Sequence, residues 1–319
     1  MFNMSSRLVA LAISAAIAST PIAVSQAHEV WVTNMTSANV TVYSTDNYKL
    51  IATIPTGAGA HNVTLTRDGR VALVANVGDG TVSIIDTDAK RVVATVPSGA
   101  KPHGISVSPD GSRALASSVG EGQITYIDVA AGEAIYSEII GKKAMMSVFS
   151  TDGKRAFIVE PTNSTIIEFD LAKRAVIRTL SGGIGTMAFI PSPDWKQAWM
   201  TVPKEDRIVL LDIDTGKALG SIAVEGEPHG LVFSPDGSRG YVVQRGLDQV
   251  AVVDTVSRQV IQSEYVGERP DMLAISPDGK RLYVTIRDGD KMLVLSTADF
   301  STIAEVKTGD QPHGIAYRQ

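Results

Sequence analysis

Short apolar runs separated by turn residues recur along most of the chain. In one stretch these runs are Gly230–Ser234, Gly240–Val243, Gln249–Val253 and Gln259–Ser263. Runs of this length that are rich in Val, Ile and Tyr, and bounded by Gly, Pro and Asp, are typical of β-strands. No helical spacing of apolar residues extends over a useful length after residue 27. The pattern predicts an all-β protein.

A recurring turn sets the period of the pattern. The tetrapeptide Ser-Pro-Asp-Gly, or a close variant, places aspartates at a constant spacing of 42 residues, at Asp68, Asp110, Asp152, Asp194, Asp236 and Asp278. Pro presets φ and Gly accepts a positive φ, so this sequence suits a tight reversal. Four strands in a repeat of about 40–45 residues are typical of one blade of a β-propeller.

The two ends of the chain supply the parts of one more blade. Six units fill residues 61–312, and His313–Tyr317 then matches only the first strand of a unit. Glu29–Gly57 matches only the other three strands. We therefore expect a seven-bladed β-propeller of four-stranded antiparallel blades, with strands A to D running from the channel outward. Its last blade takes strand A from the C-terminus and strands B–D from the N-terminus, which pairs edges that would otherwise be exposed.

The first 27 residues have the pattern of a secretory signal. Arg7 is followed by the apolar run Leu8–Ala18 and then by Ser25-Gln26-Ala27. A positive start, a short apolar core and small residues before the cleavage site are the marks of such a segment, which is too short to remain as a membrane span. We expect cleavage after Ala27, a single propeller domain over residues 28–319 and a periplasmic location.

Composition and charge narrow the chemistry. The chain has no Cys, so neither a disulfide framework nor a thiolate metal site is available. Its net charge of −5 argues against nucleic-acid binding, which needs a basic surface. No known catalytic motif is present, so we predict no catalytic residue.

Several segments resemble one known family. Trp31-Val32-Thr33-Asn34 and Tyr283-Val284-Thr285-Ile286 are similar to the Tyr-Val-Thr-Asn strand that names the YVTN β-propeller repeat family. Lys101-Pro102-His103-Gly104, Glu227-Pro228-His229-Gly230 and Gln311-Pro312-His313-Gly314 are similar to the motif that precedes its strand A. The resemblance covers residues 28–319 and implies the propeller fold. It also implies a bacterial exported protein that accompanies periplasmic quinone- or metal-dependent oxidation systems.

One repeat position gathers the candidate ligands. The residues seven positions before each turn aspartate, with His313 as the seventh member, are His61, His103, Met145, Met187, His229, Asp271 and His313. They begin strand A, so they should form a ring at one mouth of the channel. Imidazole, thioether and carboxylate groups suit copper, or zinc, and His313, His61 and His103 on consecutive blades form a conceivable three-His arc. The alternative is that each His only hydrogen-bonds the loop of the neighbouring blade, and the residues alone favour this structural role.

The same face is expected to be acidic. Its connections between strands B and C carry Asp79, Asp206, Asp248 and Asp290 among others. Singly these residues suit turn geometry, whereas together they would attract a cation or a protein partner. Three functions remain open. The first is a monomeric accessory propeller that binds a metal ion, a small ligand or a redox protein. The second is a lactonase-like hydrolase or lyase with its site at the same mouth, and the third is a structural interaction scaffold.

Overall fold

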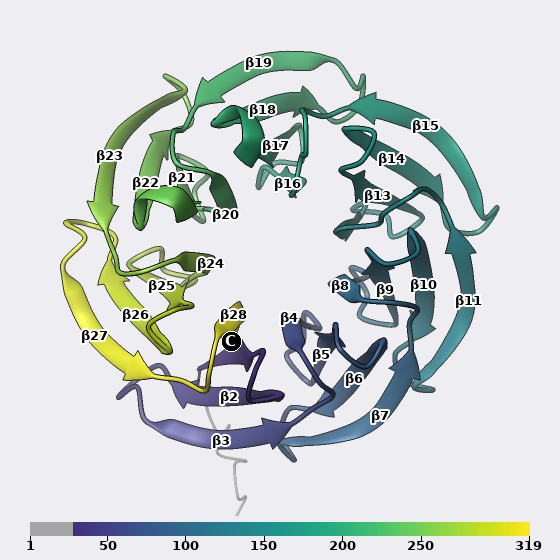
Figure 1. The fold of residues 1–319 in the computed structure, drawn as a ribbon, viewed down its shortest axis with the longest axis horizontal. Helices are drawn as coiled ribbons and strands as arrows, with labels where there is room; N and C mark the ends of the chain where they lie inside the picture. Colours follow the sequence, from purple (N-terminus) through teal and green to yellow (C-terminus); the bar gives the residue numbers. More distant parts are fainter. Residues whose placement is uncertain (1–27) are drawn as a thin grey trace, which may run out of the picture.

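The computed structural model describes residues 28–319, which form seven four-stranded antiparallel sheets around a central channel (Figure 1). The predicted seven-bladed β-propeller is confirmed. The signal segment and its cleavage site were predicted for residues 1–27 and lie outside the described residues. Within the described part, no helix is long and apolar enough to cross a membrane.

Each blade runs from an inner strand at the channel to an outer strand at the rim (Figure 1). The first blade contains β4 (Ala60–Leu65), β5 (Val71–Asn76), β6 (Thr81–Asp86) and β7 (Arg91–Pro97). The second contains β8 (Pro102–Val107), β9 (Arg113–Ser118), β10 (Gln123–Asp128) and β11 (Glu133–Ile139). The third contains β12 (Ser147–Phe149), β13 (Arg155–Glu160), β14 (Thr165–Asp170) and β15 (Ala175–Ser181).

The fourth blade contains β16 (Ile190–Pro191), β17 (Gln197–Val202), β18 (Arg207–Asp212) and β19 (Ala218–Ala223). The fifth contains β20 (Pro228–Phe233), β21 (Arg239–Gln244), β22 (Gln249–Asp254) and β23 (Gln259–Tyr265). The sixth contains β24 (Pro270–Ile275), β25 (Arg281–Ile286), β26 (Lys291–Ser296) and β27 (Thr302–Lys307). Single 3-10 turns, η1 (Pro203–Glu205) and η2 (Arg245–Leu247), follow β17 and β21. The third and fourth blades have the shortest inner strands.

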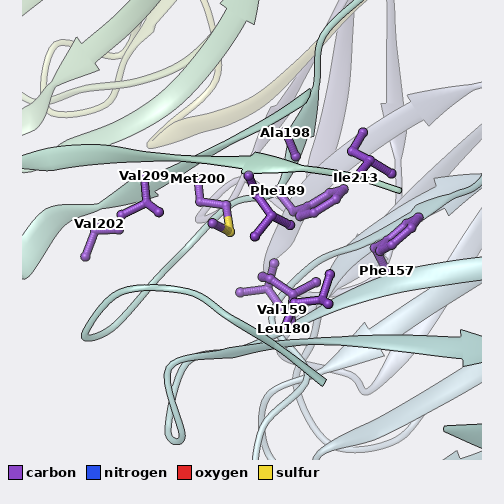
Figure 2. Close-up of a cluster of buried hydrophobic side chains, with 11 residues drawn as sticks. Phe157, Val159, Leu180, Phe189, Ala198, Met200, Val202, Val209 and Ile213 are labelled. Carbon is purple, nitrogen blue, oxygen red and sulfur yellow. The ribbon is translucent and has the colours of Figure 1, made fainter. Parts of the chain in front are cut away.

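The hydrophobic core lies between the blades. Alternate side chains of each strand face the neighbouring sheet, so each interface buries its own apolar cluster. Figure 2 shows the cluster between the third and fourth blades, where the rings of Phe157 and Phe189 stack with centroids 4.9 Å apart. Met200 and Val202 on β17 belong to the same cluster. Because every blade packs on two neighbours, the core continues around the ring.

The seventh blade joins the two ends of the chain, as predicted. Its strands, from the channel outward, are β28 (Pro312–Arg318), β1 (Glu29–Asn34), β2 (Asn39–Ser44) and β3 (Leu50–Pro55). Antiparallel pairing of β28 with β1 closes the ring.

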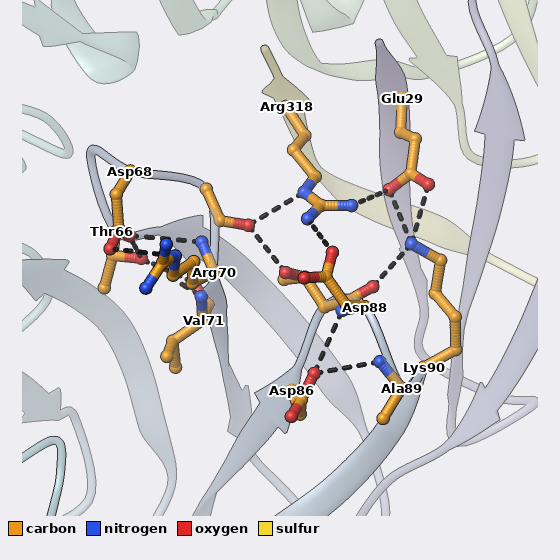
Figure 3. Close-up of polar contacts among 12 residues, drawn as sticks. Glu29, Thr66, Asp68, Arg70, Val71, Asp86, Asp88, Ala89, Lys90 and Arg318 are labelled. Atoms are coloured by element: carbon orange, nitrogen blue, oxygen red, sulfur yellow. Dashed lines mark hydrogen bonds and ion pairs between the residues drawn. The ribbon is translucent and has the colours of Figure 1, made fainter. Parts of the chain in front are cut away.

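A buried ion network holds this junction (Figure 3). The Arg318 guanidinium, only 3 % exposed, donates to Gly69 O at 2.8 Å and pairs with Glu29 Oε2 at 3.2 Å and with Asp88. Lys90 Nζ also contacts Glu29, at 2.6 Å. The network thus links the last strand to the first strand and to the first blade.

Candidate metal centre at the channel mouth

Five of the seven predicted ring residues occupy one structural position. His61, His103, His229, Asp271 and His313 are each the second residue of an inner strand, namely β4, β8, β20, β24 and β28. These strands belong to five consecutive blades. Met145 and Met187 precede the short strands β12 and β16 of the two remaining blades. The repeat therefore places the four His and one Asp on consecutive blades as an arc, and the two Met residues occupy the remaining part of the ring.

Threonines of the neighbouring strands hold the backbone of this arc. Thr33 Oγ1 donates to His61 O, and Thr285 Oγ1 donates to His313 O at 2.8 Å. Each Thr is the third residue of a Tyr-Val-Thr-Asn-like segment. The Thr hydroxyl bonds the backbone carbonyl of the ring histidine on the next blade, so the segment fixes the backbone position of that histidine.

The arc is a chain of direct contacts. His229 Nε2 lies 3.4 Å from Asp271 Oδ1, and His313 Nε2 lies 3.5 Å from Asp271 Oδ2. The ring centroids of His313 and His61 are 3.6 Å apart, and those of His61 and His103 are 4.0 Å apart. His61 Nδ1 also lies 3.2 Å from His103 O, a contact with the inner strand β8 of the neighbouring blade rather than with its loop.

One trio in the arc has the geometry of a metal site. His229, Asp271 and His313 each offer a ligand atom, and these atoms lie within 4.8 Å of one another; in residues 28–319 this is the one such group of three. Metal–ligand distances of about 2.0–2.1 Å in a tetrahedral zinc site imply ligand–ligand separations of about 3.3–3.4 Å. The contacts to Asp271 are close to that edge, and they use different carboxylate oxygens, Oδ1 for His229 and Oδ2 for His313.

The three-His arc is arranged differently. The ring of His61 lies between those of His103 and His313, in tilted contact with both. Among the described residues, the ligand nitrogens of these three histidines do not all lie within 4.8 Å of one another. The structure brings together His229, Asp271 and His313 instead.

Burial keeps the four imidazoles neutral. It lowers the pKa of His103 to about 4 and that of His229 to about 3. The pKa values of His61 and His313 also lie well below the ordinary value, again chiefly because of burial. Neutral imidazole is the form that binds metal ions.

Two arginines that the sequence analysis missed flank Asp271. Asp271 is fully buried, and Arg245 donates to its Oδ1, while Arg287 Nη1 lies 3.6 Å from its Oδ2. Asp271 Oδ2 has no hydrogen-bond partner among the described residues. Arg245 and Arg287 stand one repeat apart, on the two blades nearest Asp271. That shared repeat position is the signal that could have identified them.

A small cavity adjoins the cluster. Its volume is about 30 Å³, and it is lined by His103, His229 and His313 together with Asn62, the methionines Met146, Met187 and Met272, and other apolar residues. The predicted ring residue Met187 lines it, whereas at the Met145 position the neighbouring Met146 does. This volume holds an ion or one or two water molecules.

The acidic residues of this face mostly hold loops in place. Asp79 accepts the N–H of Ala58 at 2.6 Å. Asp206, Asp248 and Asp290 accept those of Glu227, Arg269 and Gln311 at 2.9, 2.7 and 2.8 Å. Each bond joins a B–C connection to a D–A linker, so these carboxylates tie neighbouring loops together.

Comparison with known proteins supports the fold. Residues 11–154 match the model of a family described as YNCE-like β-propeller, which is less than half of the chain. No curated protein sequence matches the chain.

Solved structures match over most of the chain. A hydrazine synthase chain of Kuenenia stuttgartiensis is 21% identical with a TM-score of 0.76, covering 84% of this chain and 92% of that one. The periplasmic gluconolactonase PpgL of Pseudomonas aeruginosa is 19% identical, with a TM-score of 0.77 and coverage of 92% and 99%. A putative 6-phosphogluconolactonase of Bacteroides fragilis is 16% identical, with a TM-score of 0.80 and coverage of 94% and 100%. At these identities the similarity establishes the β-propeller fold.

Proposed function

We propose that this protein is an exported accessory propeller that binds a transition-metal ion at the mouth of its channel, with His229, Asp271 and His313 as ligands. The observation that carries the proposal is the approach of their ligand atoms to within 4.8 Å. Two imidazoles and one carboxylate form a ligand set known from zinc proteins, with a fourth position left for water or a partner's ligand.

The surroundings of the trio support this role. Arg245 bonds Asp271 Oδ1, so it orients the carboxylate as outer-shell partners of metal ligands do. Asp271 Oδ2 is buried without a hydrogen-bond partner, which leaves its lone pairs for a ligand. The cavity of about 30 Å³ suits an ion with a bound water rather than a sugar lactone.

Metal titration of the full chain tests the proposal. After chelator treatment and dialysis, the wild-type protein should bind one equivalent of zinc or copper, measured by calorimetry and by elemental analysis. His229→Gln and His313→Gln should each weaken binding by roughly 100-fold or more, since even outer-shell changes cost 10–100-fold.

His28 supplies a matched control. Its ring lies 5.7 Å from that of Tyr317, near the opposite end of β28 from His313. His28→Gln should leave metal binding unchanged. Absence of stoichiometric metal in the wild type, with every ion tried, would contradict the proposal. Turnover of a lactone panel by the wild type that is lost in His229→Gln would favour the hydrolase with its site at this mouth instead.

We further propose that the protein works in the periplasm. The support is the signal-like pattern of residues 1–27 and the periplasmic location stated for the similar propeller PpgL. Cell fractionation with mass spectrometry of the purified protein should find a mature N-terminus at His28. A cytoplasmic protein that retains residues 1–27 would refute this part.

A further inference from the structure

The cavity beside the proposed ligands contains sulfur as well as nitrogen donors. Met146, Met187 and Met272 line it together with His103, His229 and His313. Met272 Sδ lies only 3.4 Å from the point where a Cβ on Gly230 would stand, so this thioether packs against the residue that follows His229. The other lining residues named for this cavity offer one amide, Asn62, and otherwise apolar groups or backbone.

This donor set has a chemical preference. Thioether sulfur is a soft ligand that selects Cu(I), whereas carboxylate, carbonyl and water oxygens suit hard cations. Imidazole serves copper and zinc alike. The cavity joins imidazole to thioether and is nearly free of oxygen donors, so its lining favours a soft cation.

We infer that the metal ion held at this mouth is monovalent copper, bound by the imidazoles of His229 and His313 and by the thioethers of Met187 and Met272. The inference rests on the proposed metal-binding function; it names the ion and places the two thioethers, rather than the Asp271 carboxylate, beside the two imidazoles. It requires no redox step, because the ion binds in the oxidation state in which it is supplied.

An anaerobic competition experiment tests the inference. The full chain is titrated with Cu(I) against a chromophoric cuprous chelator, with Ag(I) as a redox-inert monovalent probe and with Zn(II) in parallel. The test variant is Met187→Leu/Met272→Leu, which removes both sulfurs at nearly constant volume. Met292→Leu, a buried methionine in the core of the sixth blade, is the control.

The double variant should lose about tenfold or more in affinity for Cu(I) and Ag(I), while its Zn(II) affinity changes by less than about twofold. Met292→Leu should match the wild type for all three ions. Cu(I) and Ag(I) affinities that are unchanged in the double variant would overturn the inference, and His229-dependent Zn(II) binding would then leave the proposed function standing. If the wild type binds none of the three ions, both fail.

Discussion

At the scale of single residues, glycines decide how closely the inner strands approach. A Cβ on Gly314 would lie 2.5 Å from His61 O, and one on Gly230 would lie 2.7 Å from Asp271 O. A Cβ on Gly104 would lie 2.8 Å from Met145 O. Each glycine follows a ring histidine, and the backbone of the next inner strand packs directly against it. The Pro-His-Gly motif thus brings the ring residues of adjacent blades into contact.

Gly314→Ala should therefore destabilise the protein and loosen the metal site. The new methyl group must displace β28 from β4, and such overpacking typically costs about 1–3 kcal/mol. Urea denaturation measures this loss, and metal titration of the same variant should show weaker binding because His313 moves with β28.

A second glycine supplies the control for this change. A Cβ on Gly246 meets no atom closer than 3.5 Å, which is ordinary contact. Gly246→Ala should leave both stability and metal affinity nearly unchanged. If Gly314→Ala behaved in the same way, the close approach would not be needed for the arc.

At the scale of elements, the same hydrogen bonds to the aspartate carboxylate occur in the turns between strands A and B. In the second blade, Ser108 Oγ donates to Asp110 Oδ1 at 2.6 Å, and the N–H of Ser112 donates to the same oxygen at 3.0 Å. These hydrogen bonds, that of Ser108 first, lower the pKa of Asp110. The equivalent bonds from Ser234 and Ser238 lower the pKa of Asp236 to about 2.

These carboxylates predict a defined response to acid. A group with a lowered folded-state pKa contributes stability above its unfolded pKa and loses that contribution as the pH falls through the folded value. For Asp236 the loss should run from about pH 4 to about pH 2. Asp236→Asn should therefore unfold at lower urea than the wild type at pH 7, and this difference should shrink toward pH 2.

Asp214, on an exposed turn of the fourth blade, allows a matched test. The effect of Asp214→Asn on the urea midpoint should be small at both pH values. A difference between Asp236→Asn and the wild type that stayed constant from pH 7 to pH 2 would show that the carboxylate charge contributes nothing.

The strands were predictable because the turn residues that bound them are local in sequence and recur in every repeat. The turn residues recur every 42 positions, so a strand predicted at Gln249–Val253 is found as β22 (Gln249–Asp254). The ring register followed from the same spacing, and it placed His229, Asp271 and His313 on consecutive blades. Which of the ring residues form the trio was not predictable, because ring tilt depends on side-chain packing. Arg245 reaches Asp271 only through its length and rotamer, which spacing does not encode.

At the scale of the whole molecule, stability depends on the junction between the two ends of the chain. Arg318 is almost fully buried and pairs there with both Glu29 and Asp88. Removing one partner from a buried ion pair leaves an uncompensated charge in a poorly solvated place. The ring should be most vulnerable at this point.

Arg318→Met should lower the free energy of unfolding by about 3–5 kcal/mol, because Glu29 loses one of its two cationic partners. Replacing both charges, with Arg318→Met and Glu29→Gln together, should restore part of the loss. Arg70, whose nitrogen lies 4.0 Å from Asp68 in an exposed pair, is the control, and Arg70→Ala should cost less than about 0.5 kcal/mol. Equal losses for Arg318→Met and Arg70→Ala in thermal or urea unfolding would contradict this account.

The shared blade also sets an order of events during biosynthesis. β28 leaves the ribosome after every other described strand, and it carries both His313 and Arg318. A nascent or truncated chain that lacks β28 has an open ring, an unpaired inner edge on β1 and an incomplete ligand trio. Binding of a metal ion at the proposed site would then require that translation had reached the last strand, and a probe for that ion would distinguish finished molecules from fragments.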